Sequence, residues 1–288
     1  YLGHPRRTYG RHRPHHSTVQ ISARLINMEH IFAKKSLGQN WLVSQSALAK
    51  IVDAAEVKRG ERVLEIGPGK GALTERLLAA GAEVTAIEKD HRLTLPLQEK
   101  FTAELKKSAL TLLEADALKL PESLLADLSP YKLVANIPYY ITGEIIRAFL
   151  ESDFPPIKAV IMVQKEVAKR ILAADKKESI LSISVKAYGA PTIAGIVPRG
   201  AFRPVPNVDS AILVISDINK NFFDTIMARD FFAIVKKGFA QKRKFLKSNL
   251  DISNETLSAC GLADKIRAED LILNNWKNLT EKLHPISS

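Results

Sequence analysis

The sequence predicts an α/β fold, in which a doubly wound, mostly parallel sheet is followed by a small all-helical domain. A glycine loop, GPGKG at 67–71, lies between a strand-like run and a helix-like run, as at the start of a parallel βαβ unit. Short apolar runs then alternate with helical stretches, which is typical of Rossmann-like domains. From about residue 218 the apolar spacing is helical to the end of the chain.

The elements follow in order from their apolar spacing. Helical spacing begins at 46–57, and the strand before the glycine loop is RVLEI at 62–66. Further parallel strands are expected at 83–88, 109–114, 132–136 and 157–164. After residue 179 three β-rich runs, at 179–189, 191–198 and 209–216, predict antiparallel strands that close the sheet. We therefore expect an α/β domain over 29–217 and a helical domain over 218–288.

Composition is that of an ordinary globular protein. The 288 residues are 46% hydrophobic and 25% charged, and no apolar run reaches the roughly 18 residues of a membrane span. The single cysteine, Cys260, excludes an internal disulfide framework and a multi-cysteine zinc site. We expect no metal, no membrane contact and a monomer in the cytoplasm.

The net charge of +11 is concentrated in two stretches. Residues 1–28 carry five arginines and no acid, and residues 231–250 carry six bases and no acid, including Lys242, Arg243 and Lys244. This distribution fits a polyanion binder, although a solvated helix face fits the charge alone equally well. We expect residues 1–28 to be a disordered extension, read from an upstream start ahead of Met28 or, as the minor alternative, an organellar targeting peptide.

The glycine loop and two acids predict a nucleoside cofactor. Gly67, Gly69 and Gly71 let a ligand approach the backbone and the following helix N-terminus. Glu88 ends the next strand, where a carboxylate can accept from both ribose hydroxyls, and Asp116 could accept from an adenine amine or serve as a helix cap. The loop alone does not separate a nicotinamide dinucleotide from S-adenosylmethionine.

The tetrapeptide Asn136-Ile137-Pro138-Tyr139 makes the chemistry more specific. The Asn136 side-chain oxygen and the Pro138 carbonyl can accept from the two N–H groups of an adenine amine, which aligns its nitrogen lone pair with a sulfonium methyl. Tyr139 offers a flat face to an unstacked base. In isolation such a motif could equally be a strand-end turn.

With these residues in view, the chain resembles the ribosomal RNA adenine dimethyltransferase family, over Phe32 to about Leu283. Eight motifs occur in the family's order: KKSLGQNWL at 34–42, EIGPGKGALT at 65–74, IEKD at 87–90, EADAL at 114–118, NIPYYIT at 136–142, QKEVAKR at 164–170, VPRGAFRPVPNVDSAI at 197–212 and QKRKFLKSNL at 241–250. The resemblance implies a class I S-adenosylmethionine-dependent methyltransferase domain with a mostly parallel sheet of about seven strands. Trp41 and Arg199 depart from the residues usual at their positions.

The resemblance also implies roles for individual residues. The donor would contact the following residues: Gln39, Asn40, Leu42, Gly67, Gly69, Gly71, Glu88, Asp116 and Asn136. Methyl transfer would depend on Asn136, Pro138 and Tyr139, with Phe202 holding the target base from its other side. Lys242, Arg243 and Lys244, expected on a basic helical segment, would grip RNA phosphates.

The function implied is N6-dimethylation of two adjacent adenosines near the 3′ end of small-subunit (16S) ribosomal RNA, with S-adenosylmethionine as donor, in small-subunit biogenesis. KKSLGQN, VPRGAFRPVP and RKFLKSNL favour the small-subunit branch over the sister enzymes that methylate large-subunit RNA and confer macrolide resistance. A non-catalytic nucleic-acid-binding relative is disfavoured by the intact Glu88, Asp116 and Asn136. An NAD-dependent oxidoreductase is disfavoured because no hydride-transfer acid and base are found.

Overall fold

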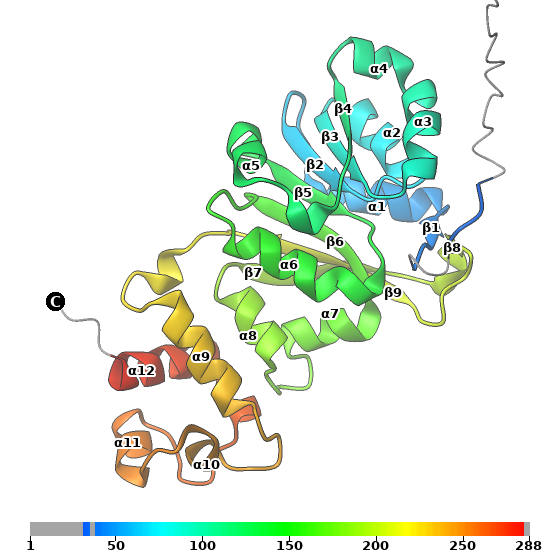
Figure 1. Cartoon of the computed structure of the whole chain (residues 1–288). Coiled ribbons are helices and arrows are strands. Elements are labelled where there is room, and N and C mark those ends of the chain that lie inside the picture. The colour runs from blue at the N-terminus through cyan, green and yellow to red at the C-terminus, as the bar shows by residue number, and fades with distance from the viewer. Residues whose placement is uncertain (1–30, 35–37, 285–288) are drawn as a thin grey trace, which may run out of the picture.

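The core of the computed structural model, which describes residues 31–34 and 38–284, is a seven-stranded sheet with the strand order β4-β3-β2-β5-β6-β9-β7 (Figure 1). The predicted extension at 1–28 lies outside the described residues. β2 to β6 are parallel, whereas β9 is antiparallel to both β6 and β7. The fold is therefore the predicted Rossmann-like α/β architecture, and the chain crosses over between β2 and β5, where such sheets bind ligands.

The seven strands of this sheet closely match predicted ranges, whereas β1 and β8 were not predicted. The strands are β1 Trp41–Leu42, β2 Arg62–Ile66, β3 Glu83–Glu88, β4 Leu110–Glu114, β5 Lys132–Ala135, β6 Lys158–Gln164, β7 Ala190–Val197, β8 Phe202–Arg203 and β9 Ser210–Ser216. The α-helices are α1 Gln45–Ala55, α2 Ala72–Ala79, α3 His91–Lys100, α4 Thr102–Lys106, α5 Glu122–Leu128, α6 Thr142–Glu151, α7 Lys165–Leu172, α8 Ile180–Lys186, α9 Ala228–Gly238, α10 Leu246–Leu250, α11 Asn254–Ala259 and α12 Leu273–Leu283. Short 3-10 helices include Ala117–Lys119 and Tyr139–Ile141.

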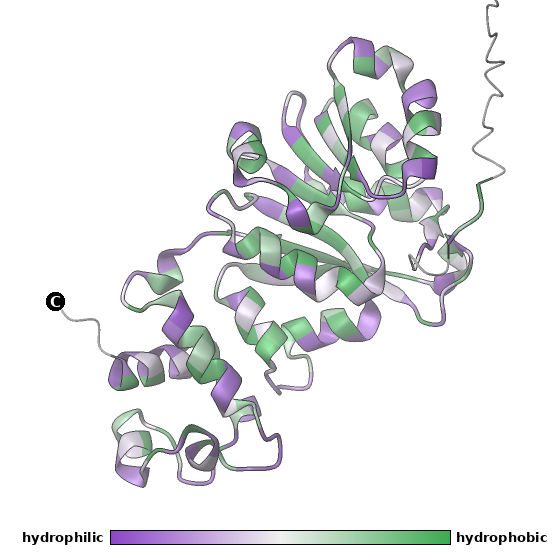
Figure 2. Cartoon of the chain, viewed as in Figure 1, coloured by the Kyte–Doolittle hydropathy of each residue, from purple (hydrophilic) through white to green (hydrophobic). Residues whose placement is uncertain are grey.

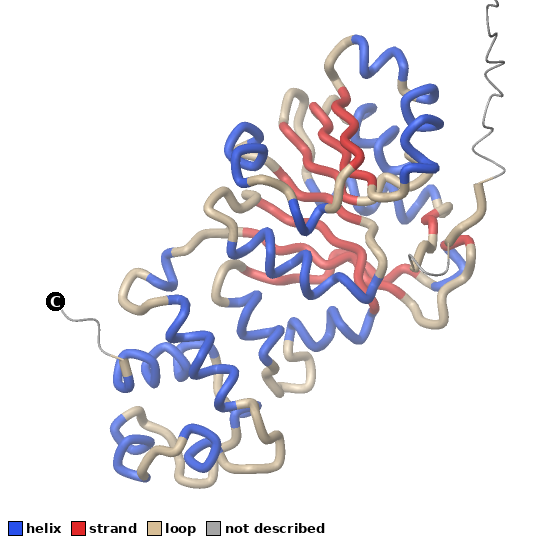
Figure 3. The backbone as a smooth tube through the Cα atoms, in the orientation of Figure 1, coloured by secondary structure: helices blue, strands red, loops and turns tan. Residues whose placement is uncertain are grey.

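The sheet is covered by helices on both faces (Figure 3). One face packs on α1, α2 and α3, and the other on α6, α7 and α8. The central strands are apolar along nearly their whole length, as expected for strands buried on both faces (Figure 2). None of the described helices is long and apolar enough to cross a membrane.

The expected strand at 179–189 is wrong, because this segment forms α8. Its alternating Ser and Ile residues resemble a strand, but a reciprocal capping box between Ser179 and Ser182 starts a helix here. The Ser182 hydroxyl also donates to the Ser179 carbonyl at 2.9 Å, so this serine can be buried in a helix together with Ile183 and Val185. The antiparallel pairing expected for 191–198 and 209–216 is confirmed.

A two-stranded antiparallel sheet was not anticipated. β1 pairs with β8, so that Leu42 lies opposite Phe202. The pair joins the segment before α1 to the loop between β7 and β9, two segments far apart in the sequence. It lies at the end of the molecule remote from the C-terminal helices (Figure 1).

Helices occupy the chain after β9, as predicted, but the basic segment is not helical throughout. α9 ends at Gly238 and α10 begins at Leu246, so Lys242, Arg243 and Lys244 lie in the intervening loop. The Asn249 side chain donates to the carbonyls of Gly238 and Gln241, and thus satisfies backbone acceptors that a continued helix would have used. The expectation of a helix at these three bases is therefore wrong.

Candidate functional site

A cavity of about 300 Å³ opens at the carboxyl edge of the parallel strands β2 to β5. Most of the residues singled out from the sequence line it: Gln39, Asn40, Leu42, Gly67, Gly69, Glu88, Asp116, Asn136, Pro138, Tyr139 and Phe202. Gly71 lies just behind the wall as the N-cap of α2, and the basic loop 242–244 is not part of the cavity. Open α/β sheets bind ligands at this edge.

The glycine loop between β2 and α2 has a backbone that only glycine adopts readily. Gly67, Gly69 and Gly71 all have φ between +58° and +77°. A Cβ on Gly69 would lie 3.0 Å from the Trp41 ring, and one on Gly71 would lie 2.5 Å from the Phe101 ring. The loop therefore needs glycine both for its conformation and for space.

Glu88 is held at the end of β3 by backbone donors. Its two carboxylate oxygens accept from Gly69 N at 3.1 Å and from Asp90 N at 2.8 Å, and the residue is 6% exposed. Burial raises the pKa of Glu88, while the backbone N–H groups oppose that shift. The carboxylate thus links the glycine loop to the end of β3 in a fixed orientation.

Asp116 lies at the cavity after β4 and also caps a short helix. One oxygen accepts from Leu118 N at 3.1 Å, at the start of the 3-10 helix 117–119, and the other pairs with Lys89 at 2.9 Å. The Lys89 ammonium lowers the pKa of Asp116, which keeps the carboxyl ionised. The two functions considered for this acid from the sequence, cap and cavity residue, are compatible in the structure.

The tetrapeptide 136–139 follows β5 and leads into the 3-10 helix 139–141. The Asn136 side chain has no hydrogen-bond partner within residues 31–34 and 38–284, and the Pro138 carbonyl accepts a single long bond, from Ile141 N at 3.2 Å. The Tyr139 hydroxyl lies 2.5 Å from the hydroxyl of Ser210 on β9, and burial raises the pKa of Tyr139. Both acceptors can therefore receive further donors at the cavity.

The segment 38–42 forms the wall that faces the glycine loop. Lys70 lies 4.5 Å from the centre of the Trp41 ring, which also packs on Gly69. Asn40 donates to the Gly38 carbonyl at 3.2 Å. Phe202, 1% exposed, lies in the cavity wall beside Leu42, so its predicted contact with a target base depends on access through the cavity and stays a prediction.

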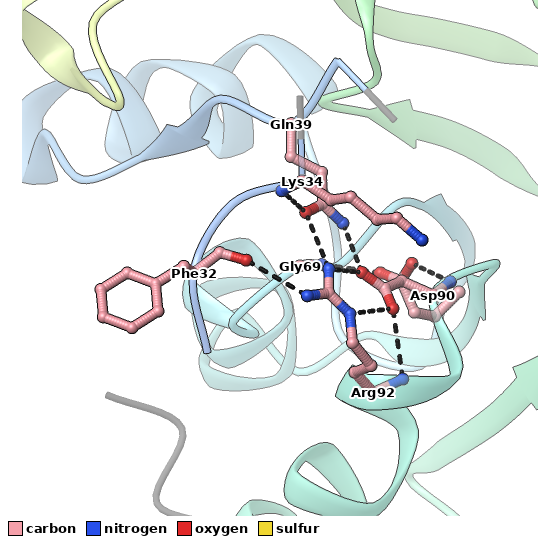
Figure 4. Close-up of polar contacts among 7 residues, drawn as sticks. Phe32, Lys34, Gln39, Gly69, Asp90 and Arg92 are labelled. Atoms are coloured by element: carbon pink, nitrogen blue, oxygen red, sulfur yellow. Dashed lines mark hydrogen bonds and ion pairs between the residues drawn. The ribbon is translucent and has the colours of Figure 1, made fainter. Parts of the chain in front are cut away.

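An ion-pair network fastens this segment to the end of β3 (Figure 4). Asp90 pairs with Arg92 at 2.6 Å and accepts from the Gln39 side chain at 2.8 Å. The Arg92 hydrogen bond is the main reason that the pKa of Asp90 falls to about 2. Sequence reasoning assigned Gln39 but missed Asp90 and Arg92, although Asp90 belongs to the IEKD motif.

Sequence reasoning also missed Lys89 and Ser210, for which only the motifs around them gave a signal. Within the part of the chain that the structure describes, no three His, Cys, Asp or Glu side chains converge as metal ligands. The cavity instead combines a glycine loop, one acid that ends β3, one acid that follows β4, and two acceptors after β5 that can receive further donors.

Comparisons with known proteins identify the family of the chain. The family model of ribosomal RNA adenine dimethylase matches residues 31–284. A protein of Dehalococcoides mccartyi (strain CBDB1) named ribosomal RNA small subunit methyltransferase A is 43% identical over 86% of this chain and 87% of its own length. A protein of the same name from Lactiplantibacillus plantarum is 39% identical over 87% of this chain and 90% of its own length.

Two solved structures share the fold. A dimethyladenosine transferase from Plasmodium falciparum has a TM-score of 0.69 at 26% identity, covering 83% of this chain and 95% of that one. The 23S rRNA methyltransferase ErmE has a TM-score of 0.68 at 26% identity, covering 85% of this chain and 99% of that one. The family model and these relatives confirm the resemblance predicted from the eight motifs. The chain belongs to the ribosomal RNA adenine dimethylase family.

Proposed function

We propose that this chain transfers methyl groups from S-adenosylmethionine to N6 of two adjacent adenosines near the 3′ end of small-subunit ribosomal RNA. One observation carries the proposal: the glycine loop, Glu88 and the acceptors of Asn136 and Pro138 all line the same cavity. The small-subunit substrate is favoured because relatives named small-subunit methyltransferases are 37–43% identical to the chain.

The residues present fit a nucleoside donor. The Gly67 and Gly69 backbone lines the cavity without side chains, and Glu88 is fixed where ribose hydroxyls could donate to it. Asp116 and Leu118, whose backbone N–H the Asp116 carboxylate caps, lie one strand further, where an adenine amine could be held. We propose that these residues, with Gln39, Asn40, Leu42 and Asn136, hold the donor.

When bound, S-adenosylmethionine supplies an electrophilic sulfonium methyl group. In the first transfer the Asn136 side-chain oxygen and the Pro138 carbonyl would accept the two N–H groups of the target amine, which would direct the nitrogen lone pair toward that methyl. As the methyl leaves the sulfonium sulfur for the nitrogen, the nitrogen becomes cationic and would release a proton to solvent. Tyr139, fixed through Ser210, offers its ring to the adenine, and Phe202 closes the other side. Positioning and electrostatics supply the catalysis, and no strong base is needed.

The rest of the chain fits a ribosomal RNA partner. The exposed bases Lys242, Arg243 and Lys244 would contact phosphates outside the cavity. We propose that residues 29–217 form the methyltransferase domain and residues 218–288 a helical RNA-binding domain of a monomer. The bacterial relatives favour the cytoplasm.

Methyl transfer to isolated ribosomal subunits tests the proposal. Small and large subunits from a strain without dimethyladenosine are incubated with labelled donor, and the modified positions are mapped. We expect label on two adjacent small-subunit adenosines, lost in Asn136→Ala and kept in Asn254→Ala, the same change in α11. Label on the large subunit would assign the chain to the resistance branch, and RNA binding without label would indicate a non-catalytic relative.

A further inference from the structure

The network that fastens the N-terminal segment to β3 centres on Gln39 (Figure 4). Its side-chain oxygen accepts from Lys34 N at 2.8 Å, and its side-chain nitrogen donates to Asp90 at 2.8 Å. Gln39 also lines the cavity, next to Gly38 and Asn40. One side chain therefore ties the wall of the cavity to both the segment before it and the end of β3.

Asp90 is a buried carboxylate that accepts several hydrogen bonds. It is 3% exposed and receives the Gln39 amide, the Arg92 side chain and, at 3.2 Å, the Arg92 backbone N–H. Its own N–H donates to Glu88, the carboxylate that also holds the glycine loop. The fastening of the segment is thus continuous with the floor of the cavity.

The guanidinium group of Arg92 completes the network. Nε and Nη2 donate to Asp90 at 2.9 and 2.6 Å, Nη2 also approaches Gln39 Oε1 at 3.5 Å, and Nη1 reaches the Phe32 carbonyl at 3.4 Å. A lysine could keep the charge next to Asp90 but could not span these partners at once. Arg92 lies outside the cavity wall, and its side chain is 35% exposed.

The network holds one wall of the cavity in place. Residues 38–42 form the wall opposite the glycine loop, where Trp41 packs on Gly69 and Lys70. On the side of Leu42 the segment is held by the short β1–β8 pair. On the side of Gly38 it is held by the contacts of Gln39 with Asp90 and Arg92, and by the packing of Gly38 against Tyr140 and Pro138. The contacts on the side of Gly38 include no strand pairing, so they can break while the sheet stays intact.

We propose that Asp90 and Arg92 form a latch which closes residues 38–42 over the donor cavity, and that its opening controls exchange of the methyl donor. The latch rests on the proposed function, because it takes S-adenosylmethionine as the ligand of this cavity. Two methyl groups on one amine require two donor molecules, so exchange must occur between the transfers. Arg92 is a positioning residue that acts through Asp90 and Gln39, whereas Asp90 itself also lines the cavity.

Donor release without RNA tests the latch directly. Trp41 lies in the moving segment and reports on it by fluorescence, while Trp276 is fully buried among the C-terminal helices and gives a constant background. We expect Arg92→Ala to raise the dissociation rate of S-adenosylmethionine about tenfold and to make Trp41 more accessible to acrylamide. Arg92→Lys should fall between the wild type and Arg92→Ala.

The matched control is Arg76→Ala, which removes an arginine that bonds Gln45 on the neighbouring helices α1 and α2. We expect its donor dissociation rate to equal that of the wild type. Equal rates in Arg92→Ala and wild type, or an equal rise in Arg76→Ala, would overturn the latch while leaving the donor assignment standing. A wild-type chain that binds no S-adenosylmethionine would instead overturn the donor assignment itself.

Discussion

Glu65 is a buried carboxylate beneath the glycine loop, one residue before the end of β2. It is 0% exposed, and neither of its oxygens has a hydrogen-bond partner in residues 31–34 and 38–284. Burial, reinforced by the nearby Glu88 carboxylate, raises the pKa of Glu65 to about 8. At neutral pH the folded protein therefore holds this side chain largely protonated, whereas the unfolded chain ionises it.

This difference predicts a pH-dependent stability. Between about pH 4.5 and about pH 8 the folded state binds the Glu65 proton and the unfolded state does not, so the free energy of unfolding falls as pH rises through this window. Glu65→Gln removes the ionisation. We expect the free energy of unfolding of the variant, relative to that of the wild type, to be higher at pH 8 than at pH 5 by on the order of a few kcal/mol.

Urea unfolding at several pH values measures the effect. Glu83→Gln, which neutralises an exposed carboxylate at the start of β3, controls for the loss of one negative charge. If the stability difference between Glu65→Gln and wild type stays constant from pH 5 to pH 8, the folded protein does not hold Glu65 protonated.

The loop between α9 and α10 presents the densest positive charge of the described chain outside a helix. Lys242, Arg243 and Lys244 are consecutive and exposed, and residues 231–250 contain no acid to neutralise them. Replacing all three with alanine should weaken binding of small-subunit RNA and lower the slope of log affinity against log salt by about 2 to 3, because about three phosphate contacts are lost. Donor affinity should not change.

Fluorescence anisotropy with labelled RNA over a range of KCl concentrations checks this slope, and calorimetry checks the donor. The matched triple variant replaces Arg59, Lys106 and Lys107, which are exposed bases around the β3–β4 side of the sheet. An equal loss of slope in the two variants would mean that the RNA senses only net charge and not this loop.

Sequence patterns predicted the elements whose signal is local and failed where the outcome depends on partners. The strands at 62–66 and 83–88 were predicted to the residue, since their apolar runs and flanking turns are unambiguous. The strand predicted at 179–189 was wrong because a capping box and buried serines stabilise a helix there despite the alternating Ser and Ile residues. The helix predicted at 242–244 was wrong because the Asn249 side chain donates to the Gly238 carbonyl and so ends α9 there.

In the candidate site too, residues with a local sequence signal were predicted and residues that depend on distant contacts were not. Family motifs located Glu88 and Asn136, since each ends or follows a strand at the ligand-binding edge. The residues that fix Gln39 and Tyr139 were not visible in the sequence. Arg92 and Ser210 act through contacts 53 and 71 residues away along the chain, to Gln39 and Tyr139, and such contacts exist only once the sheet has formed.

On the scale of the whole molecule, the C-terminal helices share a hydrophobic core with one face of the sheet. Tyr188, just after α8, packs against Phe223 and Phe232 with ring centres 5.1 and 6.1 Å apart. Lys177, in the loop before α8, pairs with Glu269 and Asp270 near the C-terminus. Two proposed domains are thus joined by apolar and charged contacts rather than by a linker alone.

A shared core predicts that the two parts unfold together. In a Trp41→Phe variant, Trp276 alone reports on the C-terminal helices, while far-UV circular dichroism reports on the whole chain. We expect the two signals to give the same urea midpoint, because losing the C-terminal helices would expose the apolar face that they cover. Tyr188→Ala should lower both midpoints by the same amount, corresponding to roughly 3 kcal/mol for a buried aromatic side chain. If Trp276 unfolds first, and Tyr188→Ala moves only that transition, the helices form a separate cooperative unit that docks on the sheet.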